Sequence, residues 1–103
     1  GAQADNIKNW SFNDSEAFKC YFRCLFISEQ VVSEQGGDFN DDNYFKFFKT
    51  PDLLANADNC HTEKWISTAH ECQGAYEIMK CNYIANPEGV REAFIDYFYK
   101  KSN

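Results

Sequence analysis

The sequence predicts an all-α domain, a compact bundle of about five to six short helices. Apolar residues recur at helical spacing through most of its 103 residues, and no stretch alternates apolar and polar residues for long enough to form a sheet. A chain of this length forms one domain, which we expect to span residues 1–103. Signals that start or end helices divide it into helix-length pieces, at Gly36-Gly37, Thr50-Pro51 and Asn86-Pro87.

The first long helix is expected from Asp14 to about Gln35, with Asn13 or Asp14 as its cap. Two glycines, Gly36 and Gly37, end it. Its apolar positions are Phe18, Phe22, Leu25, Phe26 and Ile27.

Two short helices are expected next. The first runs from Asp41 through Phe48 and has acidic residues at its positive end. Thr50 as N-cap and Pro51 as first helical residue start the second. The apolar positions of this second helix are Leu53, Leu54 and Ala57.

The rest of the chain predicts two long helices. Apolar residues keep the helical spacing between Thr62 and Ile84, which predicts one long helix and leaves a break near Gly74 open. Asn86-Pro87 starts the last helix, and two lysines suit its C-terminal end. Its apolar positions are Val90, Phe94, Ile95, Phe98 and Tyr99, and the lysines are Lys100 and Lys101.

The charge balance restricts the partners. Sixteen acidic and 10 basic residues give a net charge of −6, which repels phosphate backbones and anionic lipid and so argues against nucleic acid or membrane surfaces as partners. The longest apolar stretches, such as residues 24–27, are far shorter than the roughly 20 residues of a membrane span, so we expect no membrane insertion. The acidic runs are interpreted as faces of the protein that lie in solvent. The alternative is that one of these runs binds a cationic amine.

The cysteines indicate the compartment. Five cysteines in 103 residues are dense for a cytosolic protein and predict a secreted, extracellular protein with disulfide bonds. The start of the chain has no basic region followed by an apolar one, so this expectation rests on the cysteines. Five is an odd number, so one thiol lacks an internal partner.

The spacing of the cysteines resembles that of a known protein family. Three residues separate Cys20 from Cys24, then 35, 11 and 8 residues lead to Cys60, Cys72 and Cys81. This pattern resembles the last five of the six cysteines of the insect odorant-binding and pheromone-binding proteins. The flanking residues agree, and the likeness covers about Ile7 to Tyr99. The agreeing segments are Lys8-Asn9-Trp10-Ser11-Phe12, Cys20-Tyr21-Phe22-Arg23-Cys24-Leu25-Phe26 and His70-Glu71-Cys72-Gln73-Gly74-Ala75-Tyr76.

The resemblance implies a disulfide pairing and an apolar cavity at the centre of the bundle. Cys20 would pair with Cys72 and Cys60 with Cys81, which leaves Cys24 unpaired. The family's first cysteine and most of its first helix are missing from this sequence. We expect the uncovered face of the Cys20 helix, with Phe22 and Phe26, to form a homodimer contact. The alternative is that residues 3–12 fold back, with Trp10 and Phe12 filling the gap.

Aromatic and aliphatic side chains at helical spacing are the candidate ligand contacts. For any single one of them, a place in the core is the competing interpretation. Hydroxyls of Tyr44, Tyr76 or Tyr83 could orient a ligand head group. The candidates are Phe22, Phe26, Tyr44, Phe45, Phe48, Leu53, Leu54, Trp65, Ile66, Tyr76, Phe94 and Phe98.

The resemblance implies a secreted carrier of a small hydrophobic ligand, such as an odorant, a pheromone or a fatty acid. The alternative is a salivary or haemolymph relative that scavenges biogenic amines or lipids or contacts another macromolecule. We expect no enzyme, no cofactor and no metal, because the cysteine spacings do not suit zinc and no base orients Cys24. His61 and His70 are interpreted as surface residues, with pH-dependent ligand release as the alternative.

Overall fold

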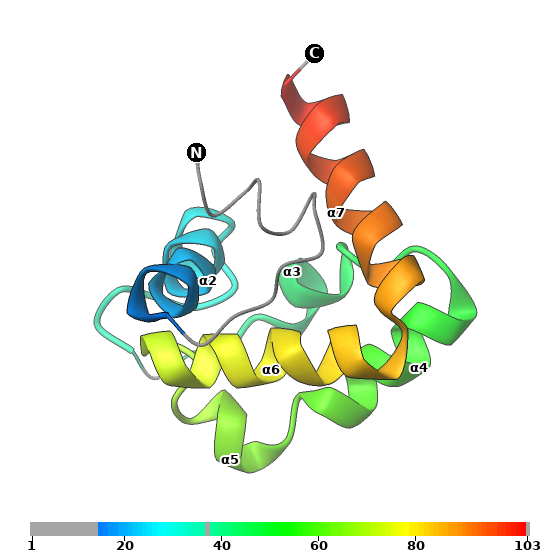
Figure 1. The fold of residues 1–103 in the computed structure, drawn as a ribbon. Helices are drawn as coiled ribbons and strands as arrows, with labels where there is room; N and C mark the ends of the chain where they lie inside the picture. Colours follow the sequence, from blue (N-terminus) through cyan, green and yellow to red (C-terminus); the bar gives the residue numbers. More distant parts are fainter. Residues whose placement is uncertain (1–14, 37, 103) are drawn as a thin grey trace.

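The computed structural model describes residues 15–36 and 38–102, with the side chains of residues 98–102 outside the description. This part of the chain is helical and contains no strand, and its one isolated bridge joins Val32 to Phe39, which confirms the predicted all-α class. The helices, shown in Figure 1, are α2 (Glu16–Ser28), α3 (Asp41–Phe45), α4 (Pro51–Cys60), α5 (Glu63–Ile66), α6 (Cys72–Ala85) and α7 (Pro87–Ser102). None of these helices is long and apolar enough to cross a membrane.

Helix α2 is shorter than predicted at both ends. Its cap is Ser15, whose hydroxyl accepts a hydrogen bond from the Phe18 backbone N–H at 3.2 Å. It ends at Ser28 because Gln30 takes a left-handed conformation, with φ of 60°, which an α-helix cannot continue. The chain then turns Val31 and Val32 into the core. The segment after the turn is held by the bridge from Val32 to Phe39 and by a hydrogen bond from the Asn40 N–H to the Val31 carbonyl at 2.8 Å.

Two predicted helix starts are confirmed. The Thr50 hydroxyl accepts a hydrogen bond from the Leu53 N–H at 3.2 Å, and Pro51 is the first residue of α4. Pro87 opens α7, and the Asn86 side chain accepts a hydrogen bond from the Gly89 N–H at 3.0 Å. These side chains satisfy N–H groups that have no partner within their own helix.

Two other boundaries differ from the prediction. Helix α3 ends at Phe45 instead of Phe48, so that Phe47 and Phe48 are buried outside regular helix. The single helix expected over residues 62–84 is divided into α5 and α6, and the break lies at residues 67–71 and not near Gly74. The Ser67 hydroxyl donates to the Lys64 carbonyl at 2.8 Å. Such bonds from short polar side chains compete with the helical pattern and favour a turn.

Helix α6 lies at the centre of the arrangement. It crosses the middle of the molecule with α2 on one side and α5 on the other, and α7 leaves its end at a steep angle (Figure 1). Two disulfides connect it to the rest of the chain, one from Cys72 to Cys20 on α2 and one from Cys81 to Cys60 on α4. Both predicted pairings are thereby confirmed, and Cys24 keeps an exposed free thiol.

Candidate functional site

The interior of the bundle is built from aromatic rings. Phe22 on α2 lies with its ring centroid 6.3 Å from that of Tyr76 and 6.4 Å from that of Phe94. Tyr44 on α3 lies 6.4 Å from Phe26 and 5.4 Å from Phe48, both in edge-to-face geometry. All six rings are buried. Half of the predicted ligand contacts are therefore brought together in one core from α2, α3, α6, α7 and the segment after α3.

The other predicted ligand contacts differ in position. Leu53 is buried, and Phe45, Trp65 and Ile66 are half-buried. Leu54 is 39% exposed, because the inward face of α4 is the one that carries Leu53 and Ala57, four residues apart. Leu54 therefore lies on the surface and not in the aromatic interior. The side chain of Phe98 lies outside the described residues.

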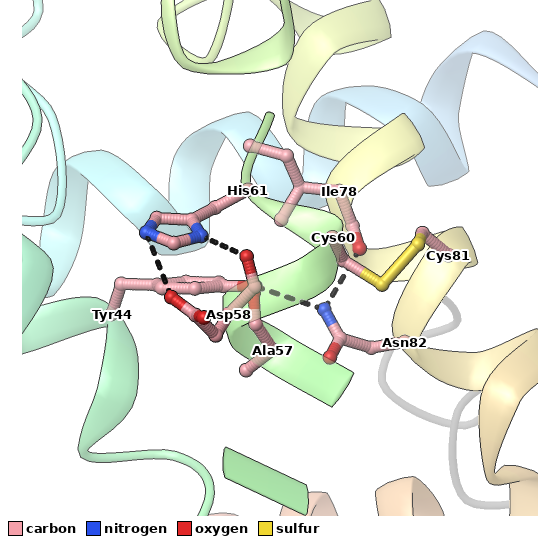
Figure 2. The surroundings of a disulfide bond; sticks show 8 residues. All are labelled: Tyr44, Ala57, Asp58, Cys60, His61, Ile78, Cys81 and Asn82. Atoms are coloured by element: carbon pink, nitrogen blue, oxygen red, sulfur yellow. Dashed lines mark hydrogen bonds and ion pairs between the residues drawn. A yellow bond between two sulfur atoms is a disulfide. The ribbon is translucent and has the colours of Figure 1, made fainter. Parts of the chain in front are cut away.

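The amide oxygen of Asn82 is a buried polar atom without a hydrogen-bond partner in the described part of the chain. The Asn82 side chain on α6 is 1% exposed, and its Nδ2 donates hydrogen bonds to the Tyr44 hydroxyl at 3.0 Å and to the Ile78 carbonyl at 2.9 Å. The Tyr44 hydroxyl donates to the Ala57 carbonyl at 2.8 Å. The Asn82 Oδ1 atom accepts no hydrogen bond from any residue that the structure describes, and Figure 2 shows it turned away from Tyr44 and Ile78. An unpaired buried carbonyl oxygen is unfavourable by about 1–3 kcal/mol.

The Tyr44 hydroxyl stays protonated. Burial raises its pKa above the usual range, and the carboxylates of Asp58 and Asp41 raise it further, while the hydrogen bond from Asn82 lowers it. As a neutral phenol, Tyr44 can donate to Ala57 and accept from Asn82 at the same time. This explains why the amide nitrogen of Asn82 faces Tyr44 and its oxygen does not.

The arrangement is therefore an aromatic, disulfide-linked helical core in which no described residue donates to the buried oxygen of Asn82. A model of the PBP/GOBP family matches residues 1–84 of the chain. The chain belongs to the PBP/GOBP family. Members of this family are odorant- and pheromone-binding proteins, secreted binding proteins for small hydrophobic molecules and not enzymes. No curated protein and no solved structure matches the chain.

The predicted homodimer contact depends on the exposure of Phe22 and Phe26. The PBP/GOBP resemblance led us to expect an uncovered face with Phe22 and Phe26, but both side chains are fully buried within one chain. That expectation is wrong, because Phe22 packs against Phe18, Tyr76 and Phe94, and Phe26 packs against Tyr44. A homodimer contact through these two rings is therefore not available. The fold-back of residues 3–12, with Trp10 and Phe12, lies outside the described residues.

The two histidines of this PBP/GOBP chain have different surroundings. The ring of His61 stacks on Tyr44 with 5.5 Å between centroids, and its Nε2 lies 3.9 Å from carboxylate oxygens of both Asp41 and Asp58. The side chain of His61 is only 15% exposed, so His61 is not the surface residue that was predicted. His70 is half-buried, and its carbonyl accepts a hydrogen bond from Arg23 Nε at 2.9 Å. No group of three potential metal ligands occurs within residues 15–36 and 38–102.

Sequence reasoning missed Asn82. Tyrosine hydroxyls were the predicted partners of a ligand head group, whereas the interior group without a partner among the described residues is an amide oxygen. Asn82 follows Ile78 and Met79 at helical spacing and so lies on the buried face of α6. A polar residue in an apolar row is the signal that could have identified it.

Two open grooves walled by described residues lie outside the aromatic core. One follows the turn after α2, around Ile27 and Val31, and the other lies between the start of α4 and α7. Leu53 lines the second groove, and no other predicted ligand contact with a described side chain lines either groove. The enclosed apolar cavity remains a prediction.

Proposed function

We propose that this chain is a secreted carrier that takes a small hydrophobic molecule, such as an odorant, a pheromone or a fatty acid, among its buried aromatic rings. The observation that carries the proposal is an aromatic interior that holds an acceptor, Asn82 Oδ1, with no partner among residues 15–36 and 38–97, in a PBP/GOBP chain. The two disulfides support the extracellular assignment, since such bonds persist in oxidising compartments.

The physical chemistry of the interior favours an amphiphilic ligand. Transfer of about 15 methylene-sized groups from water, at about 0.8 kcal/mol each, supports micromolar binding after the entropic costs of association. A hydroxyl of the ligand would donate to Asn82 Oδ1, which removes the penalty of an unpaired buried oxygen. The proposed ligand therefore has an apolar body and a hydrogen-bond donor at one end.

The test is displacement of an apolar fluorescent probe from delipidated protein. We expect a long-chain alcohol to displace the probe at about micromolar concentration, and the methyl ether of the same alcohol to displace it less well. The protein should prefer the alcohol to the ether by about three- to tenfold, the effect of one hydrogen bond. Asn82→Leu should remove this preference. The matched control is Tyr44→Phe, which disturbs the same network at the nitrogen of Asn82 and leaves Oδ1 in place, so the preference should remain.

Two results would count against the proposal. If no long-chain alcohol, fatty acid or hydrocarbon displaces the probe, the carrier function fails and a scavenging or macromolecule-contacting role is favoured. If the alcohol and its ether bind equally to the unmodified protein, the carrier function stands but the role of Asn82 is wrong.

A further inference from the structure

The buried polar groups around Asn82 use up their hydrogen-bond donors. Asn82 Nδ2 carries two N–H groups, which donate to the Tyr44 hydroxyl at 3.0 Å and to the Ile78 carbonyl at 2.9 Å. The Tyr44 hydroxyl has one proton and donates it to the Ala57 carbonyl at 2.8 Å. The Asn82 oxygen has no donor among the described residues. This cluster therefore offers a ligand an acceptor and no donor.

Helix α6 fixes the orientation of the Asn82 amide. The Ile78 carbonyl lies four residues before Asn82 on the same helix and can only accept hydrogen bonds. If the amide turned over, its oxygen would replace its nitrogen beside the Ile78 carbonyl, at a distance that now suits a donor and an acceptor. Two acceptors at this distance repel each other, so the nitrogen stays with Ile78 and the oxygen stays available.

The described interior holds no positive charge that could pair with a bound anion. The buried polar or charged side chains of the described residues are Asn82 and Glu29, and Glu29 lies 3.6 Å from Lys46 Nζ. All other charged side chains of residues 15–36 and 38–97 are exposed or half-buried. An ionised carboxylate that enters such surroundings loses its hydration and gains no partner, which is strongly unfavourable. A neutral carboxylic acid carries an O–H group that can donate to Asn82 Oδ1.

We propose that a fatty acid binds in the aromatic interior as the neutral acid, with its O–H group donating to Asn82 Oδ1, and that the carboxylate is excluded. This rests on the proposed carrier function, because it concerns the ligand of the same site. A carboxyl group in water has a pKa of about 4, so its neutral fraction falls about tenfold for each pH unit above that value. Transport of an acid therefore depends on the pH of the surrounding fluid, whereas transport of an alcohol does not.

Titratable groups of the protein lie beside the cluster. The ring of His61 stacks on Tyr44, and its Nε2 lies 3.9 Å from carboxylate oxygens of Asp41 on α3 and Asp58 on α4. A change of pH can therefore alter the protein as well as the ligand. An alcohol meets the same protein at each pH and does not ionise. The ratio of the two dissociation constants thus isolates the ionisation of the acid.

The test compares dodecanoic acid with 1-dodecanol as competitors of an apolar fluorescent probe on the delipidated full chain. We expect the dissociation constant of the acid, divided by that of the alcohol, to rise about 100-fold between pH 5.5 and pH 7.5, because only the neutral acid binds. A rise of less than about tenfold would show that the carboxylate binds as well, and would overturn the proposal.

Methyl undecanoate tests the hydrogen bond, since it is an isomer of dodecanoic acid that has no O–H group. After correction for its neutral fraction, the acid should bind about three- to tenfold more tightly than the ester, the effect of one hydrogen bond. Asn82→Leu should remove this difference. The matched control is Asn59→Leu, the same change at an exposed asparagine of α4, which should keep it. Equal affinity of the neutral acid and the ester for the unmodified protein would overturn the role of Asn82.

Two lysines at the border of α2 and α6 are the competing anchor for a carboxylate. The Nζ atoms of Lys19 and Lys80 each lie 5.5 Å from the ring centroid of Tyr76, which belongs to the aromatic interior. Lys19→Gln and Lys80→Gln should leave the ratio of acid to alcohol unchanged at pH 7.5. A selective loss of acid binding in either variant would place a carboxylate at these lysines and overturn the proposal.

The alcohol separates failure of this proposal from failure of the carrier function. If neither 1-dodecanol nor the acid displaces the probe at any pH, the carrier function fails, and binding of the neutral acid fails with it. If the alcohol displaces the probe while the ratio stays constant with pH, the carrier function stands and only binding of the neutral acid is overturned. Both results come from the unmodified protein and do not depend on whether a variant folds.

Discussion

At the scale of single residues, Gly74 decides how closely α6 approaches the turn before it. A Cβ atom built on Gly74 would lie 2.1 Å from the Thr68 carbonyl oxygen, far inside van der Waals contact. That oxygen belongs to the backbone and also accepts a hydrogen bond from the Glu71 N–H at 2.8 Å. The turn therefore cannot move away without losing a bond, and only glycine fits.

We expect Gly74→Ala to lower the free energy of unfolding by about 1–3 kcal/mol, the usual effect of overpacking. The matched variant is Gly89→Ala, whose added Cβ would meet the ends of the Asn86 and Leu53 side chains. Side-chain ends can move, and alanine favours a helix over glycine, so this variant should lose less than about 1 kcal/mol. Equilibrium denaturation followed by circular dichroism measures both. Equal losses would show that backbone contact at Thr68 is not the cause.

At the scale of helices, boundaries set by neighbouring residues were predictable from the sequence, and boundaries set by tertiary structure were not. Thr50-Pro51 and Asn86-Pro87 start helices as predicted, because a cap bonds to an N–H only three residues away. The end of α2 was not predictable, because it comes with a left-handed conformation at Gln30, which is not a glycine, and glycine is the residue that ordinarily indicates such a conformation.

The candidate site was likewise predictable from the sequence only in part. Helical spacing predicted the buried aromatic residues, since one periodicity defines the inward face of each helix. The unpaired oxygen of Asn82 was not predictable, because it results from a hydrogen bond between side chains 38 positions apart, at Tyr44 and Asn82. The groove between the start of α4 and α7 likewise combines residues that only the fold brings together.

The caps provide a prediction at this scale. Thr50→Ala removes the side-chain acceptor for the Leu53 N–H and should destabilise the protein by about 1 kcal/mol. Thr62→Ala is the matched control, because Thr62 is also an N-cap but its side chain forms no capping hydrogen bond. It should cost less than about 0.5 kcal/mol. Thermal unfolding of the two variants measures the difference, and a larger loss for Thr62→Ala would contradict the assignment of α4 as a capped helix.

At the scale of the whole molecule, α6 is the element to which the others are attached. It contacts α2, α4, α5 and α7, and each disulfide has one cysteine on it. Helices this short are unstable in isolation, so their stability comes from packing and from covalent links. The two disulfides close loops of different length, with sequence separations of 52 and 21. The longer link attaches α2, the helix that contributes Phe22 and Phe26 to the aromatic interior.

The loop lengths predict which disulfide stabilises the fold more. In the chain-entropy model, Cys20–Cys72 contributes about 4 kcal/mol and Cys60–Cys81 about 3 kcal/mol, because the longer loop restricts the unfolded chain more. We therefore expect the double variant Cys20→Ala/Cys72→Ala to be less stable than Cys60→Ala/Cys81→Ala by about 1 kcal/mol. Both variants need Cys24→Ser in their background, since the exposed thiol of Cys24 would otherwise exchange with the remaining disulfide. Denaturant unfolding of the two proteins and of the Cys24→Ser parent gives the comparison. Should the loss of Cys60–Cys81 prove the greater, the packing of its buried Cys60 beside Tyr44 and Asn82, and not the length of the closed loop, would determine the stability of this fold.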